Sequence, residues 1–395
     1  MTDTEFWRAR GAVLRGEGSA QRVVHLGDPE AEARRAQAGE GTALVPLLGA
    51  APLRLTGPDR ASFLHGQLSN AVQGLPAGAC NHTLQLNARG QVVGEAVLCV
   101  RRDDLFLSVD DGCGPQVLAS LEAHIVFDEV RVEDLSGTLA ALTVQGPGAA
   151  EAVRRAFGEL PHEGRFAQCA FGSAGEGAAG VLLVRRRRSA AGGVDVHLLA
   201  RQLPEAVEAL MAAGARPAGE AALDLMRVVA ALPSAAREGA GGALPQELDL
   251  ASAVSFRKGC YLGQEIMARI EARGAVRKGP ARLRLTAAAA GEAGGAGAAA
   301  ALEGLALRQG GREVGRLGTV AALPQGGLAA LAVLRRELPA GGGLVVADGE
   351  AEVARAEPWP LPEAERGAGA ASGSAPDGTP GARDVQPEGA SDPGL

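Results

Sequence analysis

The most distinctive segment of the chain is Lys258-Gly259-Cys260-Tyr261-Leu262-Gly263-Gln264-Glu265. Its two glycines free the backbone to approach other parts of the protein closely. Good helix formers follow from residue 264 to 272, and an apolar stripe runs along them at helical spacing. The pattern predicts a tight turn that leads directly into a helix.

Cys260 stands at this predicted helix start, two residues after Lys258. Helix N-terminal amides and a nearby ammonium group both favour a thiolate, so the pattern predicts a reactive sulfur. The chain holds 39 lysines and arginines, and the only lysines are Lys258 and Lys278. Lysine offers a compact charge that arginine cannot replace. The alternative is an inert, buried cysteine at a turn-to-helix junction.

Length and charge limit the class of protein. A chain of 395 residues is long enough for two or three domains. The net charge of -7 argues against a dedicated nucleic-acid binder, which would usually be basic. The N-terminal residues lack the apolar core of a signal peptide, and no run approaches the roughly 20 apolar residues of a membrane helix. We expect a cytoplasmic protein without a membrane segment.

The five cysteines are irregularly spaced, at positions 80, 99, 113, 169 and 260. Their odd number and spacing do not indicate a disulfide framework, so we expect reduced thiols. They form no Cys-x-x-Cys pair, and the histidines form no matching pattern. We therefore expect neither a zinc site nor an iron–sulfur cluster held by one chain.

Hydrophobic patterning indicates an α+β fold. Strand and helix patterns alternate between residues 41 and 215, as in antiparallel sheets with helices on one face. Short, regularly spaced strand patterns after residue 276 predict a small C-terminal β-barrel. The Ala/Gly-rich stretch 287–301 is expected to be a flexible inserted loop. Residues after 360 offer nothing to bury.

Residues 258–265 resemble the signature of the YgfZ group of folate-binding proteins, relatives of the glycine cleavage T-protein (aminomethyltransferase). Weaker similarity extends over the helix pattern at 57–70, the helix before a Pro turn at 221–233, and the strand turn at 314–320. The resemblance implies a GcvT-like folate-binding fold. The expected domains are an N-terminal extension (1–40), a folate-binding region of two subdomains (41–275), a β-barrel (276–358) and a disordered tail (359–395).

The resemblance also implies a folate site. Asp195 matches the acidic residue that receives the amino and ring N–H edge of the pterin, and a carboxylate suits that edge because it accepts two parallel hydrogen bonds. Arg227 matches an arginine that faces the folate and can hold its glutamate tail or pterin carbonyl. Each has a plainer alternative: a strand-surface aspartate, and an arginine on the polar side of a helix. The other residues that we assign to ligand binding are Tyr261, Gln264 and Glu265 of the signature, and Glu95.

Two further features bear on the chemistry. True aminomethyltransferases carry an acidic pair after the glycine of the first strand turn, and this chain has Gly94 followed by Glu95. Glu95 can substitute only in part, so the broken pair argues against aminomethyl transfer. The run Arg185 to Arg188 is expected at the solvated tip of a β-hairpin rather than in contact with RNA.

The predicted function is therefore that of a folate-binding protein that supports iron–sulfur cluster assembly or repair, including enzymes that modify tRNA. Tetrahydrofolate or a one-carbon derivative would bind between the first two domains, with Cys260 and Lys258 as the catalytic pair at its rim. We expect iron–sulfur client proteins as partners and a monomer in solution. The alternatives are a tetrahydrofolate-dependent aminomethyltransferase and a noncatalytic, folate-sensing scaffold.

Overall fold

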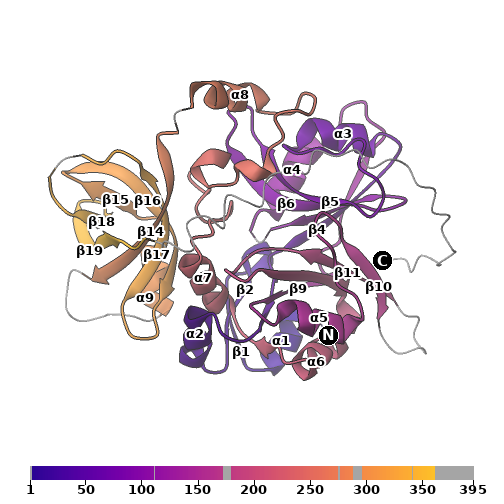
Figure 1. Ribbon diagram of the computed structural model, residues 1–395, viewed down its shortest axis with the longest axis horizontal. Helices are drawn as coiled ribbons and strands as arrows, with labels where there is room; N and C mark the ends of the chain where they lie inside the picture. Colours follow the sequence, from indigo (N-terminus) through magenta and orange to yellow (C-terminus); the bar gives the residue numbers. More distant parts are fainter. Residues whose placement is uncertain are drawn as a thin grey trace.

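The computed structural model describes residues 2–110, 112–171, 179–274, 276–287, 296–339 and 341–360. Over these ranges the chain forms a body of two stacked sheets with helices on their outer faces, and a closed barrel beside it (Figure 1). This is the α+β architecture with a C-terminal barrel that the sequence predicts, and that prediction is confirmed. None of the described helices has the length and apolar character needed to cross a membrane.

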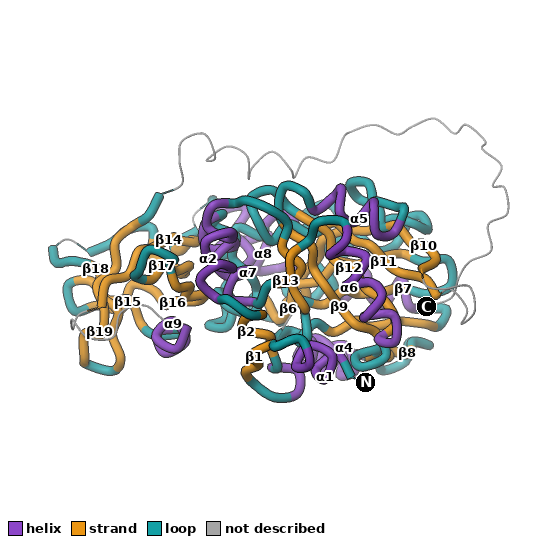
Figure 2. Tube along the Cα trace, turned by 90° about the horizontal axis from the view of Figure 1, so that it is seen from below, coloured by secondary structure: helices purple, strands orange, loops and turns teal. Residues whose placement is uncertain are grey.

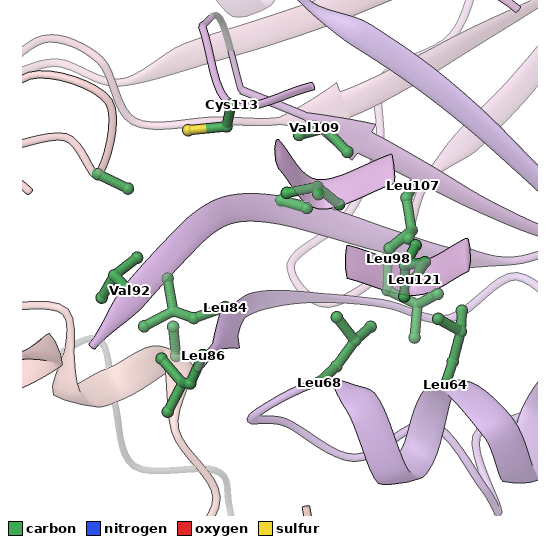
Figure 3. Close-up of a cluster of buried hydrophobic side chains, with 14 of the residues drawn as sticks. Leu64, Leu68, Leu84, Leu86, Val92, Leu98, Leu107, Val109, Cys113 and Leu121 are labelled. Atoms are coloured by element: carbon green, nitrogen blue, oxygen red, sulfur yellow. The ribbon is translucent and has the colours of Figure 1, made fainter. Parts of the chain in front are cut away.

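The first sheet is antiparallel, with strand order β5-β6-β7-β4-β8. Its strands are β4 (Ala51–Thr56), β5 (Cys80–Leu86), β6 (Val92–Val100), β7 (Leu105–Val109) and β8 (Arg131–Asp134). Helices α3 (Arg60–Gln67) and α4 (Gly114–His124) cover its outer face. Figure 3 shows Leu64, Leu68 and Leu121 pointing into a shared apolar cluster with Leu84 and Leu98. Burial of this cluster fixes both helices on the sheet.

The second sheet has the order β10-β11-β12-β9-β3-β13, and β13 is its parallel strand. Its strands are β3 (Ala43–Pro46), β9 (Leu139–Gln145), β10 (Ala167–Phe171), β11 (Ala179–Arg185), β12 (Gly193–Leu199) and β13 (Arg216–Pro217). Its outer face carries α1 (Asp3–Ala9), α5 (Ala149–Phe157) and α6 (Leu203–Ala212). Phe6 and Trp7 of α1 are buried in this core, so the N-terminal residues are part of the packed body.

The side chains between the two sheets are apolar at one end of the strands and charged at the other. Alternate residues of a strand face the same side. Near one end of the layer this rule gathers a buried apolar cluster that includes Val97, Cys99, Phe106 and Leu182. Continued along the same strands, it places charged side chains on the inner face, and these form the site described below.

Two helices separate the stacked sheets from the barrel. They are α2 (Pro29–Ala38), which follows the hairpin of β1 (Ala12–Arg15) and β2 (Arg22–Leu26), and α7 (Glu220–Val229). Both views place them between the two parts, and α7 packs on the sheets as well as on barrel strands (Figures 1 and 2). Short 3-10 helices lie at Gly18–Ala20, Ala200–Gln202, Pro245–Glu247 and Ala251–Ala253.

The barrel follows α8 (Gln264–Arg273) and closes in the order β14-β17-β16-β15-β18-β19. Its strands are β14 (Lys278–Ala287), β15 (Ala306–Gln309), β16 (Arg312–Ala322), β17 (Leu328–Arg335), β18 (Leu344–Asp348) and β19 (Ala351–Pro358). Small and branched apolar side chains fill its interior. Closure pairs every strand on both sides, so this unit exposes no free sheet edge.

Two expectations about irregular segments change. The predicted flexible loop at 287–301 is wrong for its second half, because α9 (Ala296–Leu302) forms there and Ala299 is buried. Alanine has the highest helix propensity, so an alanine run folds once a surface is available to pack on. Residues 288–295 lie outside the described part.

The tail predicted to be disordered, 359–395, lies outside the described residues from 361 onward. Trp359 itself is packed against the barrel. Its backbone N–H donates to the carbonyl of Arg282 at 2.7 Å, and the guanidinium carbons of Arg282 and Arg284 lie 4.2 and 4.7 Å from its ring centroid. The packed chain therefore continues one residue past the last barrel strand.

Candidate functional site

Lys258 anchors the signature loop on the C-terminal end of α3. Its ammonium donates to the carbonyls of His65, Leu68 (2.5 Å) and Asn70 (3.1 Å). The last carbonyls of a helix have no partner within the helix, and a cation there also interacts favourably with the helix dipole. Three N–H donors on one nitrogen can reach three converging carbonyls, whereas the planar guanidinium of arginine cannot. This requirement explains a lysine in an arginine-rich chain.

The ring of Tyr261 packs against this ammonium group. Its ring centroid lies 4.9 Å from Lys258 Nζ, a cation–π contact. Burial lowers the pKa of Lys258 to about 8 and raises the pKa of Tyr261 to about 12. The Tyr261 hydroxyl is buried and has no hydrogen-bond partner among the described residues. Buried hydroxyls normally have a partner, so a buried hydroxyl without one among the described residues is unusual.

Gly263 lets the loop approach the turn that joins β5 and β6. Its φ is +83°, and a Cβ at this position would lie 2.5 Å from the carbonyl oxygen of Asn87. Only glycine fits both the conformation and the space. The predicted close approach is confirmed at Gly263, whereas a Cβ on Gly259 would meet only His65 Nε2, at 3.7 Å.

Cys260 is an exposed, free thiol. The alternative of a buried cysteine is therefore wrong. The predicted helix forms, but α8 begins at Gln264, four residues after Cys260, so the thiol does not stand directly at the helix start. The Lys258 ammonium is engaged by carbonyl groups. The catalytic role of Cys260 and Lys258 stays a prediction.

The other two signature residues differ in exposure. Glu265 is exposed on α8 and forms an ion pair with Arg269, one turn along the helix. Gln264 is partly buried, and its backbone N–H donates to the carbonyl of Tyr261 at 3.2 Å. The side-chain hydrogen bonds of Lys258 run to the C-terminal end of α3, and that of Glu265 stays within α8. No such bond in the described part of the chain joins them to Asp195 or Arg227.

The polar end of the layer between the sheets holds five charged side chains in one network. Arg186 pairs with Glu95, and its Nη2 donates to Asp110 Oδ2 at 2.6 Å. Arg188 donates from Nη2 to Asp110 Oδ1 at 3.0 Å and forms a fork on Asp195, with Nε to Oδ1 at 3.2 Å and Nη2 to Oδ2 at 2.7 Å. The five side chains are only 2–10% exposed. Three carboxylates thus alternate with two guanidinium groups.

The arginine run is not a solvated hairpin tip, so that expectation is wrong. Arg185 and Arg187 are exposed, whereas Arg186 and Arg188 point inward. The inward pair continues the alternation of Leu182 and Val184 on β11. That alternation is the signal in the sequence that would have placed these arginines, and it depends on extending the strand period by four residues.

Glu95 is the most heavily engaged carboxylate of the network. Besides Arg186, it meets His82 Nε2 at 2.8 Å and accepts the backbone N–H of Ala235 at 3.1 Å. Burial acts to raise the pKa of Glu95, but the Arg186 guanidinium and His82 hold it well below its usual range. Burial also acts to raise the pKa of Asp195, but the neighbouring Arg188 guanidinium outweighs it, so the pKa of Asp195 is lowered. These carboxylates are fixed as anions, which does not suit them to act as proton donors near neutral pH.

Arg227 lies in a second buried cluster, between α7 and the barrel. Its Nη2 donates to Glu238 at 2.7 Å, and its Nη1 donates to Asp224 at 3.1 Å and to Thr319 Oγ1 at 3.2 Å. These polar partners agree with the plainer alternative of an arginine on the polar side of a helix, and the side chain is only 8% exposed. Arg227 therefore joins α7 to the barrel strand β16.

One turn connects the two clusters. Ala235 donates its N–H to Glu95, and three residues later Glu238 binds Arg227. Glu238 also lines a cavity of about 830 Å³ between this segment and strands β14, β16 and β17. The cavity is large enough for a cofactor-sized molecule. At its barrel side stand Lys278 and Arg335, which face each other across adjacent strands.

The fold that surrounds this central polar site is also found in a known aminomethyltransferase. The crystal structure of glycine cleavage system aminomethyltransferase T from Bartonella henselae matches 89% of this chain and 94% of its own, with a TM-score of 0.67 and 18% sequence identity. That likeness establishes the shared fold.

Sequence comparison then gives the family. The family described as the GCVT N-terminal domain matches residues 28–258, more than half of the chain, and the protein belongs to this family. It is 30% identical over 318 residues to the tRNA-modifying protein YgfZ of Edwardsiella ictaluri, covering 75% of this chain and 86% of that one. It is 27% identical over 254 residues to an aminomethyltransferase of Halalkalibacterium halodurans, covering 63% and 68% of the two chains. The predicted kinship with the YgfZ group and the glycine cleavage T-protein is confirmed.

The charge network predicts a sharp difference between neighbouring arginines. Arg188→Met leaves Asp110 and Asp195 without their shared cation, and breaking a buried ion pair costs about 3–5 kcal/mol of unfolding free energy. Arg187→Met, on the exposed side of the same run, should change stability by less than about 0.5 kcal/mol. Urea unfolding followed by far-UV circular dichroism measures both. Equal losses for the two variants would contradict the network.

We expect the free energy of unfolding to fall in acid because of His197. It is buried beside the network, shares a hydrogen bond with Ser108 Oγ at 2.8 Å, and burial lowers its pKa from 6.5 to about 4. Between pH 6.5 and 4 the unfolded chain binds a proton that the folded protein does not. Folding should therefore lose up to about 3 kcal/mol as pH falls through this window. The carboxylates Glu95 and Asp195 add their own losses only below their ordinary pKa values of 4.5 and 3.8.

The measurement is the free energy of unfolding at pH 7.0, 6.0, 5.0 and 4.5. His197→Gln keeps a hydrogen-bonding side chain but cannot titrate, so its stability should be flatter over this range. His162→Gln, at an exposed position, should keep the wild-type slope. A wild-type slope in His197→Gln would show that another group carries the effect.

Proposed function

We propose that the protein binds a reduced folate, tetrahydrofolate or a one-carbon derivative, between the two sheets and the barrel. In this proposal it supports tRNA modification through the assembly or repair of iron–sulfur enzymes. Family membership and similarity to a tRNA-modifying protein support the proposal. The structural observation that supports it most directly is that Asp195 accepts two parallel hydrogen bonds from the guanidinium of Arg188.

The two hydrogen bonds from Arg188 show how the Asp195 carboxylate could accept a pterin. The amino group and ring N–H of a pterin present two parallel donors, as the guanidinium of Arg188 does. Asp195 is thus already oriented to accept such an edge. The ligand would have to displace Arg188, which keeps Asp110 as a second carboxylate partner when it moves. The exchange therefore does not leave a buried cation unpaired.

The folate tail would extend toward the cavity. Lys278 and Arg335 lie directly opposite each other on β14 and β17, and like charges in that arrangement repel. The tail carboxylates would relieve that repulsion and account for the placement of two cations at the cavity. Arg227 is buried and already bonded to Asp224, Thr319 and Glu238, so we assign it a positioning role. It holds Glu238 at the cavity wall rather than the tail itself.

The signature residues have graded roles in this proposal. Tyr261 offers a buried hydroxyl that has no partner among the described residues and that a ligand could satisfy, and Gln264 lies next to it at the start of α8. Glu265 is a weaker candidate because it is exposed and paired with Arg269. Glu95 shapes the network through Arg186 rather than meeting the ligand alone. Cys260 is accessible to a partner or substrate, and its thiol would accept or donate the transferred group.

Aminomethyl transfer is the second candidate, because aminomethyltransferases are among the relatives and share the fold. Such an enzyme would form methylene-tetrahydrofolate from an aminomethyl-lipoyl donor. We rank it lower because the acidic pair is reduced to Glu95, and that carboxylate is committed to Arg186, His82 and a backbone N–H.

Folate binding is tested by titration with tetrahydrofolate under anaerobic conditions, followed by calorimetry. Asp195→Asn replaces a two-oxygen acceptor by an amide and should weaken binding by roughly 10- to 100-fold, the range for losing a hydrogen bond to a charged group. Asp103→Asn makes the same chemical change at an exposed position and should leave affinity unchanged. Wild-type protein that does not bind, or equal affinity in both variants, would remove the ligand assignment.

The thiol mechanism is tested by Cys260→Ser in cells that lack the native gene. Modified nucleosides in tRNA are measured by mass spectrometry after supplying wild type or variant. We expect Cys260→Ser to drop to the level of cells without the protein while keeping tetrahydrofolate affinity. Cys169→Ser, which alters a partly exposed cysteine elsewhere, should behave as wild type. Full activity of Cys260→Ser would favour the noncatalytic scaffold.

A further inference from the structure

Cys80 and Cys99 face each other directly across strands β5 and β6. The N–H of Cys80 donates to the carbonyl of Gly164 at 2.8 Å, so it points away from β6. The two cysteines are therefore a non-hydrogen-bonded antiparallel pair. In such pairs the Cα atoms are about 4.5 Å apart and the side chains approach most closely. That separation falls within the range that a disulfide can span, about 4.4–6.8 Å between Cα atoms.

The two thiols already interact. A hydrogen bond with the Cys99 side chain lowers the pKa of Cys80, and the positive charge of Arg165 acts in the same direction. Burial raises the pKa of Cys99 well above its usual range. Cys80 is partly exposed at an edge strand, whereas Cys99 is buried behind it in the layer between the sheets. The pair thus combines a reachable sulfur with a second one held against it.

We propose that Cys80 and Cys99 form a reversible intramolecular disulfide when the protein meets a peroxide. The Cys80 thiolate attacks one peroxide oxygen, the O–O bond breaks, and the departing hydroxide takes up a proton to leave as water. Cys80 is thereby oxidised to a sulfenic acid and the peroxide is reduced. The Cys99 sulfur then attacks the Cys80 sulfur, the S–O bond breaks, and the hydroxide leaves with the Cys99 proton as water. Two thiols and hydrogen peroxide give one disulfide and two water molecules.

The position of the pair connects it to the rest of the fold. Cys99 is on the same face of β6 as Glu95, separated from it by Val97. A disulfide would join the edge strand β5 to β6 at the apolar end of the layer that carries the charge network at its other end. The Cα separation typical of non-hydrogen-bonded pairs, about 4.5 Å, is near the lower limit for a disulfide, so the bond would be strained and easily reduced, as expected of a reversible modification.

Tryptic mapping of the full-length protein can identify the bond directly. The chain is cleaved after Arg60, Arg89 and Arg101, so Cys80 and Cys99 fall in separate peptides, 61–89 and 90–101. After hydrogen peroxide treatment and alkylation of the remaining thiols, these peptides should appear covalently joined. Dithiothreitol should separate them. Cys260→Ser protein is treated in parallel, because an exposed thiol reacts with peroxide independently.

Single variants test the order of the steps. In Cys99→Ala, the Cys80 sulfenic acid has no partner, so dimedone should trap it at one equivalent per chain. In Cys80→Ser, Cys99 should stay reduced, with at least a tenfold lower rate of thiol loss at that position. Cys169→Ser should leave the linked peptides unchanged. Absence of the linked peptides in wild type, or a link from Cys80 to Cys260 instead, would overturn the proposal, and neither result depends on a variant folding.

Discussion

The paired charges between the two sheets are the constraint on which the arrangement of the protein depends. A buried ion costs several kcal/mol unless opposite charge and hydrogen bonds surround it. Glu95 and Asp110 of the first sheet meet Arg186 and Arg188 of the second. The sheets can therefore stack closely only when these groups are in register. Burial of the apolar cluster around Phe106 stabilises the stacking of the sheets, and the charge pairs fix the register of one sheet on the other.

Charged hydrogen bonds of the same kind also connect the sheets to the barrel. The turn around Ala235 is held by Glu95 on one side and, through Glu238, by Arg227 on the other. Thr319 of the barrel donates its backbone N–H to Glu238 at 2.7 Å. Three units of the fold thus share a chain of charged contacts near their junction. In the proposed function, a bound ligand would exchange partners with these ion pairs, and binding would then be linked to the arrangement of the domains.

The residues of the signature loop have structural roles within the chain itself. Lys258 binds the carbonyls at the end of α3, and Gly263 fits against the turn between β5 and β6. Both residues hold the loop on the first sheet. Cys260 lies between them with its thiol exposed. The loop is therefore a rigid support for one free sulfur, which is the arrangement that the proposed chemistry needs.

The sequence by itself determined the features that depend on local pattern. Residue alternation and spacing gave the antiparallel sheets and the barrel, helix formers gave α8 to within one residue, and glycine spacing gave the close approach at Gly263. Only the tertiary structure decided which charges meet. Arg186 and Asp110 are 76 residues apart, and Lys258 and His65 are 193 residues apart. A local pattern places a side chain on one face of its strand or turn, but its partner comes from another element. That pairing exists only after the layers have packed.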